Sequence, residues 1–94
     1  MPKIVIIDDD REAAENLGIV LKGKGFDIVV ETEMENAIDT LTKTRPDLLV
    51  LDLMFPNDSS GGFKIAMEIR RTPAIRDLPV IMLTNVNQEF PINF

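Results

Sequence analysis

The sequence predicts one α/β domain, the start of a doubly wound parallel sheet. Four short apolar runs, each the length of a buried strand, alternate with three segments of helical periodicity. The runs are apolar at nearly every position, which is typical of strands that helices cover on both faces. The order is βαβαβαβ, with connections suited to parallel pairing. The 94 residues are the size of one domain.

Turns and caps set the bounds of these elements. The expected strands are residues 3–7, 26–31, 48–51 and 80–83. A first helix is expected over residues 11–24, because Asp10 is a favourable N-cap and Gly25 is favourable just beyond a C-terminus. The inward face of this helix is predicted from helical spacing: Ala14, Leu17, Val20 and Leu21, with Ala13 beside them.

Two further helices follow. Thr32 and Glu35 have the spacing of a capping box, which predicts the start of the second helix. Pro46 is expected to stop it. The third helix is expected over residues 63–72. The side chains predicted to face inward are Ala37, Ile38 and Leu41 in the second helix, and Phe63, Ala66 and Ile69 in the third.

The composition excludes several classes of protein. The net charge of −6 disfavours nucleic-acid binding, which needs clustered cations to neutralise phosphates. With no cysteine and no histidine, the chain has no thiol chemistry, no His-based triad, no imidazole metal ligand and no phosphohistidine. No apolar stretch approaches the roughly 20 residues of a membrane span. The apolar run near the start of the sequence, residues 4–7, is too short for a signal peptide. The expectation is a cytoplasmic protein without a membrane or nucleic-acid partner.

Acidic residues follow two of the predicted strands where each strand ends. Asp8 and Asp9 end the first apolar run, Asp52 ends the third, and Thr84 ends the fourth. The carboxyl ends of parallel strands meet at one edge of a sheet, where ligands of such sheets bind. Clustered carboxylates repel one another unless a cation or a shared proton intervenes, and Mg²⁺ prefers such oxygen ligands. A carboxylate is also a nucleophile toward phosphorus.

Each of these residues also has a purely structural interpretation. Asp8 and Asp9 are consistent with an acidic helix N-terminus, Asp52 with a turn, and Thr84 with a β-branched strand residue. The combination on three successive strand ends favours a site.

Three segments resemble the response regulator receiver domain of two-component signalling. They are Lys-Ile-Val-Ile-Ile-Asp-Asp-Asp (residues 3–10), Pro-Asp-Leu-Leu-Val-Leu-Asp-Leu-Met-Phe-Pro (residues 46–56) and Leu-Pro-Val-Ile-Met-Leu-Thr (residues 78–84). The resemblance implies a flavodoxin-like sheet with strand order 2-1-3-4. It also implies a single receiver domain over residues 1–94, truncated after the fourth strand, with residues 85–94 as a tail.

The resemblance assigns a role to each candidate residue. Asp52 is the implied phosphoacceptor. Asp9, Asp52 and the backbone carbonyl of Met54 are implied direct ligands of Mg²⁺, and Asp8 an indirect one through water. Thr84 is implied to hydrogen-bond the phosphoryl group and to act as a switch. The implied phosphodonor is a histidine kinase or a phosphotransfer protein, and the implied protein is a self-phosphorylating switch rather than a metabolic enzyme.

The chain also departs from the receiver pattern, because the resemblance ends before the fifth strand and its lysine. Removing a cation from a phosphoryl site is expected to impair phosphorylation at Asp52. The alternative hypothesis is therefore a phosphorylation-silent receiver that acts as an interaction module. It would form homo-oligomers through the edge of the strand at residues 80–83 and through the tail, where Phe90, Ile92 and Phe94 alternate. A haloacid-dehalogenase-type phosphatase is disfavoured, because Met54 stands where that family has a second aspartate.

Overall fold

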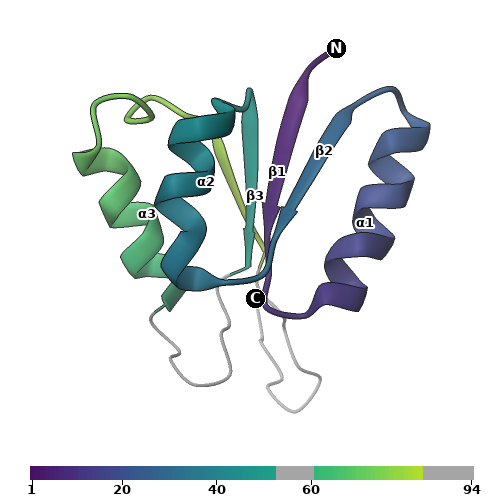
Figure 1. The fold of residues 1–94 in the computed structure, drawn as a ribbon, viewed down its shortest axis with the longest axis horizontal. Helices are drawn as coiled ribbons and strands as arrows, with labels where there is room; N and C mark the ends of the chain where they lie inside the picture. The colour runs from purple at the N-terminus through teal and green to yellow at the C-terminus, as the bar shows by residue number, and fades with distance from the viewer. Residues whose placement is uncertain (53–60, 84–94) are drawn as a thin grey trace, which may run out of the picture.

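The central feature of the fold is one parallel sheet. The computed structural model describes residues 1–52 and 61–83. In that part of the chain, β1 (Lys3–Ile7), β2 (Asp27–Glu31), β3 (Leu48–Asp52) and β4 (Val80–Leu83) pair in the order β2-β1-β3-β4. β1 and β3 are thus the two inner strands (Figure 1). The predicted flavodoxin-like fold and its strand order are confirmed, and the described residues contain no fifth strand.

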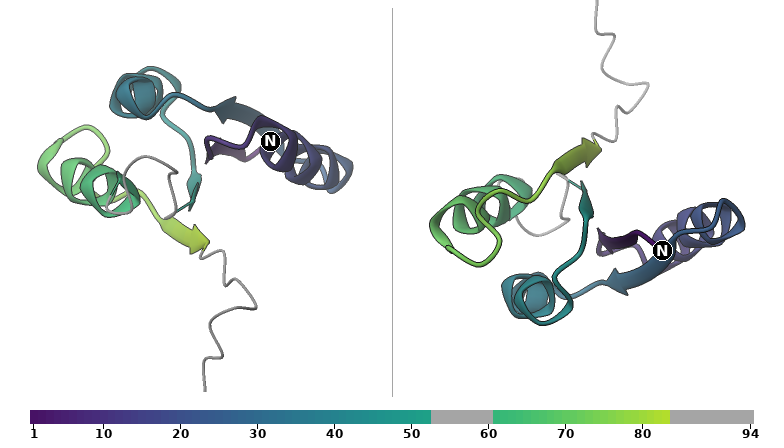
Figure 2. Two further views of the ribbon diagram at one scale, coloured as in Figure 1. Left: turned by 90° about the horizontal axis from the view of Figure 1, so that it is seen from below. Right: turned by 90° about the horizontal axis from the view of Figure 1, so that it is seen from above.

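Helices lie on both faces of this sheet. The helix α1 (Arg11–Gly23) packs on one face, and α2 (Ala37–Thr44) and α3 (Gly61–Arg71) pack on the other (Figures 1 and 2). A short 3₁₀ helix, η1 (Met34–Asn36), precedes α2. Within the described ranges, no helix has the length and apolar character that crossing a membrane requires.

The sheet separates two hydrophobic cores. Side chains alternate along a strand, so Ile4 and Ile6 of β1 pack beneath α1, whereas Val5 and Ile7 pack beneath α2 and α3. β3 alternates in the same way. The buried residues of the α1 core are Ile4, Ile6, Ala14 and Val50. Those of the larger core are Val5, Ile7, Ala37, Leu41, Leu49, Leu51, Ile65, Ile69, Ile75 and Leu78.

Both ends of α1 are capped as the sequence predicts. The Asp10 side chain accepts a hydrogen bond of 3.1 Å from the Ala13 amide, which satisfies one donor of the first turn. At the other end, the Phe26 amide donates to the Leu21 carbonyl at 3.2 Å, and Gly25 has a positive φ of 97°. This is a Schellman motif, in which glycine avoids the steric cost of the left-handed conformation.

Three predicted inward-facing residues are wrong. Val20 of α1 and Phe63 of α3 are both more than half exposed, and Ala13 of α1 is exposed as well. Gly18 and Ile65 are buried on these helices instead. Helical spacing allows two neighbouring stripes on each helix, and the side that packs is the one that meets the sheet. For α1, this side lies mainly over β2.

The predicted capping box before α2 does not form. Thr32 accepts a 3.0 Å hydrogen bond from the Arg11 guanidinium instead, and Glu33 is the N-cap of η1 without a side-chain cap. The carboxylate of Glu31 accepts from the Glu33 amide at 3.0 Å. The Thr32 hydroxyl, which would accept from a backbone amide in a capping box, therefore accepts from Arg11 of α1, 21 positions earlier in the sequence.

The edge strand β4 differs from the strand that the sequence predicts. Among the described strands it lies at an edge of the sheet, and it is not buried: Ile81, Met82 and Leu83 are 49%, 42% and 41% exposed. Only Val80 is partly buried, against the larger core.

Candidate functional site

Three carboxylates meet at the carboxyl ends of the two inner strands. Asp8 and Asp9 follow β1, and Asp52 is the last residue of β3. The register pairs Ile7 with Leu51, so the residues that follow these two lie beside one another. One carboxylate oxygen from each of the three aspartates lies within 4.8 Å of the others, and all three residues are half-buried. The strand order therefore produces the convergence that the sequence predicts.

Backbone hydrogen bonds hold Asp8 in this arrangement. Its Oδ1 accepts a 2.9 Å hydrogen bond from the amide of Asp10, two residues further on. Its own amide donates to the carbonyl of Glu31 at 3.1 Å, which ties the turn to β2. The first interaction has the form of an Asx turn, a conformation that aspartate favours. Sequence reasoning missed both anchors, although three aspartates in a row are a recognisable signal for such a turn.

The pKa of Asp8 is raised from its ordinary value of 3.8 to about 6. Loss of solvation through burial is the largest cause, and the Asp10 amide opposes it by stabilising the charged form. A hydrogen bond with Asp52 and the negative charges of Asp52 and Asp9 raise the pKa further. The charged form of the Asp8 carboxyl is therefore less favourable here than in water.

This donor set fits a hard divalent cation. Oxygen ligands with high charge density are what Mg²⁺ prefers. A bound cation would offset the burial of the Asp8 charge, which is the largest cause of the raised pKa, and also the repulsion from Asp52 and Asp9. Two sequence-predicted participants, Met54 and Thr84, lie outside the described residues.

Comparisons with known proteins agree with this architecture. The sequence profile described as "Response regulator receiver domain" matches residues 4–93. The DNA-binding response regulator MtrA of Mycobacterium tuberculosis is 38% identical over 82 residues, which are 87% of this chain and 34% of that protein. The chain thus spans about a third of the length of such curated relatives.

Solved structures of receiver domains have the same fold as this chain. The N-terminal domain of a response regulator receiver protein from Methanoculleus marisnigri superposes with a TM-score of 0.82 at 28% identity, covering 95% of this chain and 72% of that one. The BeF3-activated receiver domain of Klebsiella pneumoniae RstA superposes with a TM-score of 0.78 at 28% identity, covering 93% and 70%.

Proposed function

This chain belongs to the response regulator receiver family, and from that premise we propose that it is a phosphoacceptor of a two-component phosphorelay. The proposed acceptor is Asp52, and the proposed donor is a histidine kinase or a phosphotransfer protein. Receiver domains are signalling domains and not metabolic enzymes, so the expected output is a changed binding surface.

One observation carries this proposal. Asp52 ends an inner strand, and its carboxylate lies within 4.8 Å of those of Asp8 and Asp9. The pairing of β3 with β1 places its last residue beside the residues that follow β1, which brings the three carboxylates together. A lone acidic residue at a turn would have no such neighbours.

The proposed reaction is a phosphoryl transfer to the Asp52 carboxylate. One carboxylate oxygen forms a bond to phosphorus while the bond from phosphorus to the donor nitrogen breaks. The electron pair of the broken bond leaves with the donor, and the product is an acyl phosphate. Fixed positioning of the nucleophile supplies much of the catalysis in such transfers.

The remaining roles are proposed on the same basis. Asp9, Asp52 and the Met54 backbone carbonyl would hold Mg²⁺, with Asp8 assisting through water. When bound, the cation would neutralise charge on the phosphoryl oxygens. Thr84 would donate a hydrogen bond to the phosphoryl group.

Intact-mass spectrometry tests the phosphoacceptor. After incubation with Mg²⁺ and acetyl phosphate, we expect one added phosphoryl group in the parent protein and none in Asp52→Asn. Asp39→Asn is the matched control, because Asp39 is exposed on α2 and pairs only with Lys43 among the described ion pairs, at 3.0 Å. Uptake by Asp52→Asn equal to that of the parent would show that the acceptor is another residue.

A binding titration tests the metal ligands separately. We expect Asp9→Ala to weaken Mg²⁺ binding by about tenfold or more, as loss of a charged ligand does. Beryllofluoride is a second probe, because it activates the related RstA receiver. Unchanged Mg²⁺ affinity in Asp9→Ala would remove this residue from the proposed site.

The exposure of β4 favours a second candidate function. We propose, as the alternative, an interaction module in which the edge of β4 that faces no described strand pairs with another copy of the chain. The proposed tail contribution involves residues 85–94, which lie outside the described residues. Ile81, Met82 and Leu83 are apolar and exposed, and β4 itself carries no charge that would disfavour such pairing.

Light scattering distinguishes this alternative from the phosphoacceptor. Self-association that disappears in Ile81→Lys, together with no phosphoryl uptake by the parent, would favour the interaction module. A parent protein that stays monomeric at high concentration would exclude it.

A further inference from the structure

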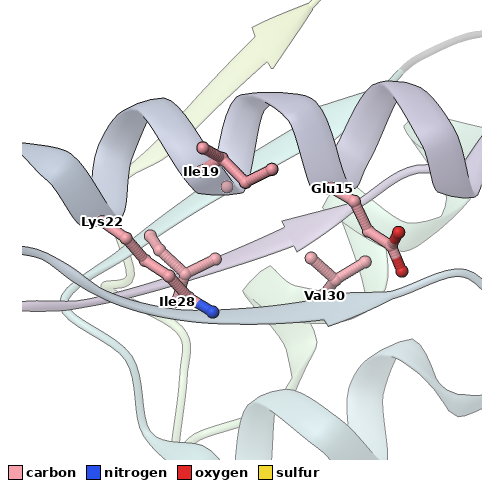
Figure 3. Close-up of a pocket in the computed structure, with 6 residues that line it drawn as sticks. Glu15, Ile19, Lys22, Ile28 and Val30 are labelled. Atoms are coloured by element: carbon pink, nitrogen blue, oxygen red, sulfur yellow. The ribbon is translucent and has the colours of Figure 1, made fainter.

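An apolar groove lies between α1 and the edge strand β2, away from the three carboxylates (Figure 3). Its volume is about 370 Å³. The six residues that line it are Glu15, Gly18, Ile19, Lys22, Ile28 and Val30. Ile28 and Val30 project from β2 toward the helix, and Glu15 and Lys22 lie at opposite ends of the groove (Figure 3).

Gly18 brings the helix close to the floor of this groove. A Cβ atom at this position would lie 3.3 Å from Cγ2 of Ile28 and 3.9 Å from Cγ2 of Val30. Glycine therefore lets the middle of α1 approach β2 between these two side chains. Ile28 and Val30 stay only half-buried, because none of the described strands lies beyond β2 on this side of the sheet.

An exposed isoleucine, Ile19, directly follows Gly18 and lines the same groove. Ile19 is 69% exposed, more than any other large apolar residue among the described ones except Met1. Single exposed apolar residues are ordinary on protein surfaces, but this one borders an open apolar groove. The helix thus presents a projecting apolar side chain and a recess at the same level.

Two charges of α1 lie symmetrically about that level, and one of them, the Glu15 carboxylate, also pairs with Arg11 of the same helix at 3.5 Å. Glu15 and Lys22 are seven residues apart, about 10.5 Å along the helix, and their midpoint falls between Gly18 and Ile19. In an antiparallel pair of such helices related by a two-fold axis at that midpoint, Glu15 lies opposite Lys22 at both ends, and Ile19 lies opposite Gly18. In this arrangement the two grooves match each other in charge.

We propose that a second copy of this chain occupies the groove, with the two α1 helices antiparallel. The Ile19 side chain of each copy would enter the groove of the other and contact the half-buried side chains of Ile28 and Val30. Glu15 of each copy would pair with Lys22 of the other. Such an isologous contact closes on itself as a dimer. The contact is small, so we expect a dissociation constant on the order of 100 µM.

Charge exchange tests this arrangement. Glu15→Lys alone and Lys22→Glu alone each turn two attractive pairs into two repulsive ones, so we expect each to weaken dimerisation about tenfold. An equimolar mixture of the two variants restores both attractive pairs in a heterodimer. The double variant Glu15→Lys/Lys22→Glu restores them in a homodimer. Sedimentation equilibrium measures all four dissociation constants.

Glu68→Lys is the matched control. It makes the same change of charge at an exposed position of α3, which packs on the opposite face of the sheet from the groove. We expect it to dimerise like the parent. Ile19→Cys adds an independent readout, because the chain has no cysteine and an oxidised dimer can form only between the two introduced thiols.

Recovery by charge exchange is the decisive result. Weakening by each single charge variant, with recovery in the mixture and in the double variant, supports the proposal. It also excludes a helix-dipole explanation, because the double variant keeps the charges that oppose the dipole. A monomeric parent, equal effects of Glu15→Lys and Glu68→Lys, or no recovery would each overturn it. β2 and β4 are opposite edges of the sheet, so association through β4 would not respond to these variants.

Discussion

β1 and β4 have nearly the same sequence character and very different surroundings. In β1, the side chains from Ile4 to Ile7 are no more than 3% exposed. In β4, those from Ile81 to Leu83 are 41% or more exposed. An inner strand has a strand on each side and helices over both faces, whereas β4 pairs only with β3 among the described strands. An apolar run therefore predicts that a strand forms, while its neighbours decide how much of it is buried.

The largest effect is expected from shortening one buried side chain of an inner strand. Leu49 of β3 is fully buried in the larger core. We expect Leu49→Ala to lower the free energy of unfolding by about 3 kcal/mol, from lost burial and the cavity that remains. Urea denaturation followed by circular dichroism measures this loss. A cost below about 1 kcal/mol would mean that β3 is no better packed than the edge of the sheet.

The next largest effect is a dependence of stability on pH, which arises at the carboxyl end of the inner strands. The pKa of Asp8 is raised to about 6 in the folded protein, so its neutral form stabilises the fold. That contribution is fully present below about pH 4 and is lost as the pH rises through 6. Because Asp8 is only half-buried, solvent screening should limit the loss to about 1 kcal/mol.

Asp8→Asn isolates this contribution. The variant keeps the oxygen that accepts from the Asp10 amide, but it has no proton to lose and stays neutral as the pH rises. We expect its stability relative to the parent to increase between pH 4 and 7 in metal-free buffer. Added Mg²⁺ should then stabilise the parent more than the variant at pH 7. A parent and variant with parallel pH profiles would contradict the raised pKa.

A smaller effect is expected at the edge strand. Ile81→Ala removes a side chain that is already half in water, so we expect it to cost about 0.5 kcal/mol or less. Urea denaturation measures the loss of unfolding free energy in this variant and in Leu49→Ala. We expect the loss in Leu49→Ala to be several times larger. Equal costs for the two variants would show that β4 is covered in solution.

The smallest effect tests the same distinction on a helix. Val20 is exposed on α1. We expect Val20→Ala to stabilise the protein slightly, by about 0.3 kcal/mol, because alanine has the higher helix propensity and little burial is lost. Thermal unfolding detects the sign of this change. A loss of 1 kcal/mol or more would indicate that this side of α1 is packed after all.

Much of the architecture was predictable because it depends on local signals. The four apolar runs, the Asp10 cap and Gly25 each act within a few residues, and the structure has all of them where the sequence placed them. The meeting of Asp8, Asp9 and Asp52 followed from strand order alone.

The errors have a different origin, because they depend on residues distant in sequence. Thr32 has the right spacing for a capping box, but Arg11 takes its hydroxyl. Val20 and Gly18 are both compatible with an inward stripe on α1, and only contact with Ile28 decides between them. A glycine among Ala14, Leu17 and Leu21 was the available signal for such a close approach.

The hydrogen bond between the Asp10 amide and Asp8 Oδ1 links the acidic cluster to the first turn of α1. Asp10 uses its own side chain to accept from the Ala13 amide. Any change in charge at Asp8 therefore reaches two backbone amides in succession. In a ¹⁵N-labelled sample, the amide resonances of Asp10 and Ala13 would act as built-in reporters of protonation or ion binding, with no added label or dye.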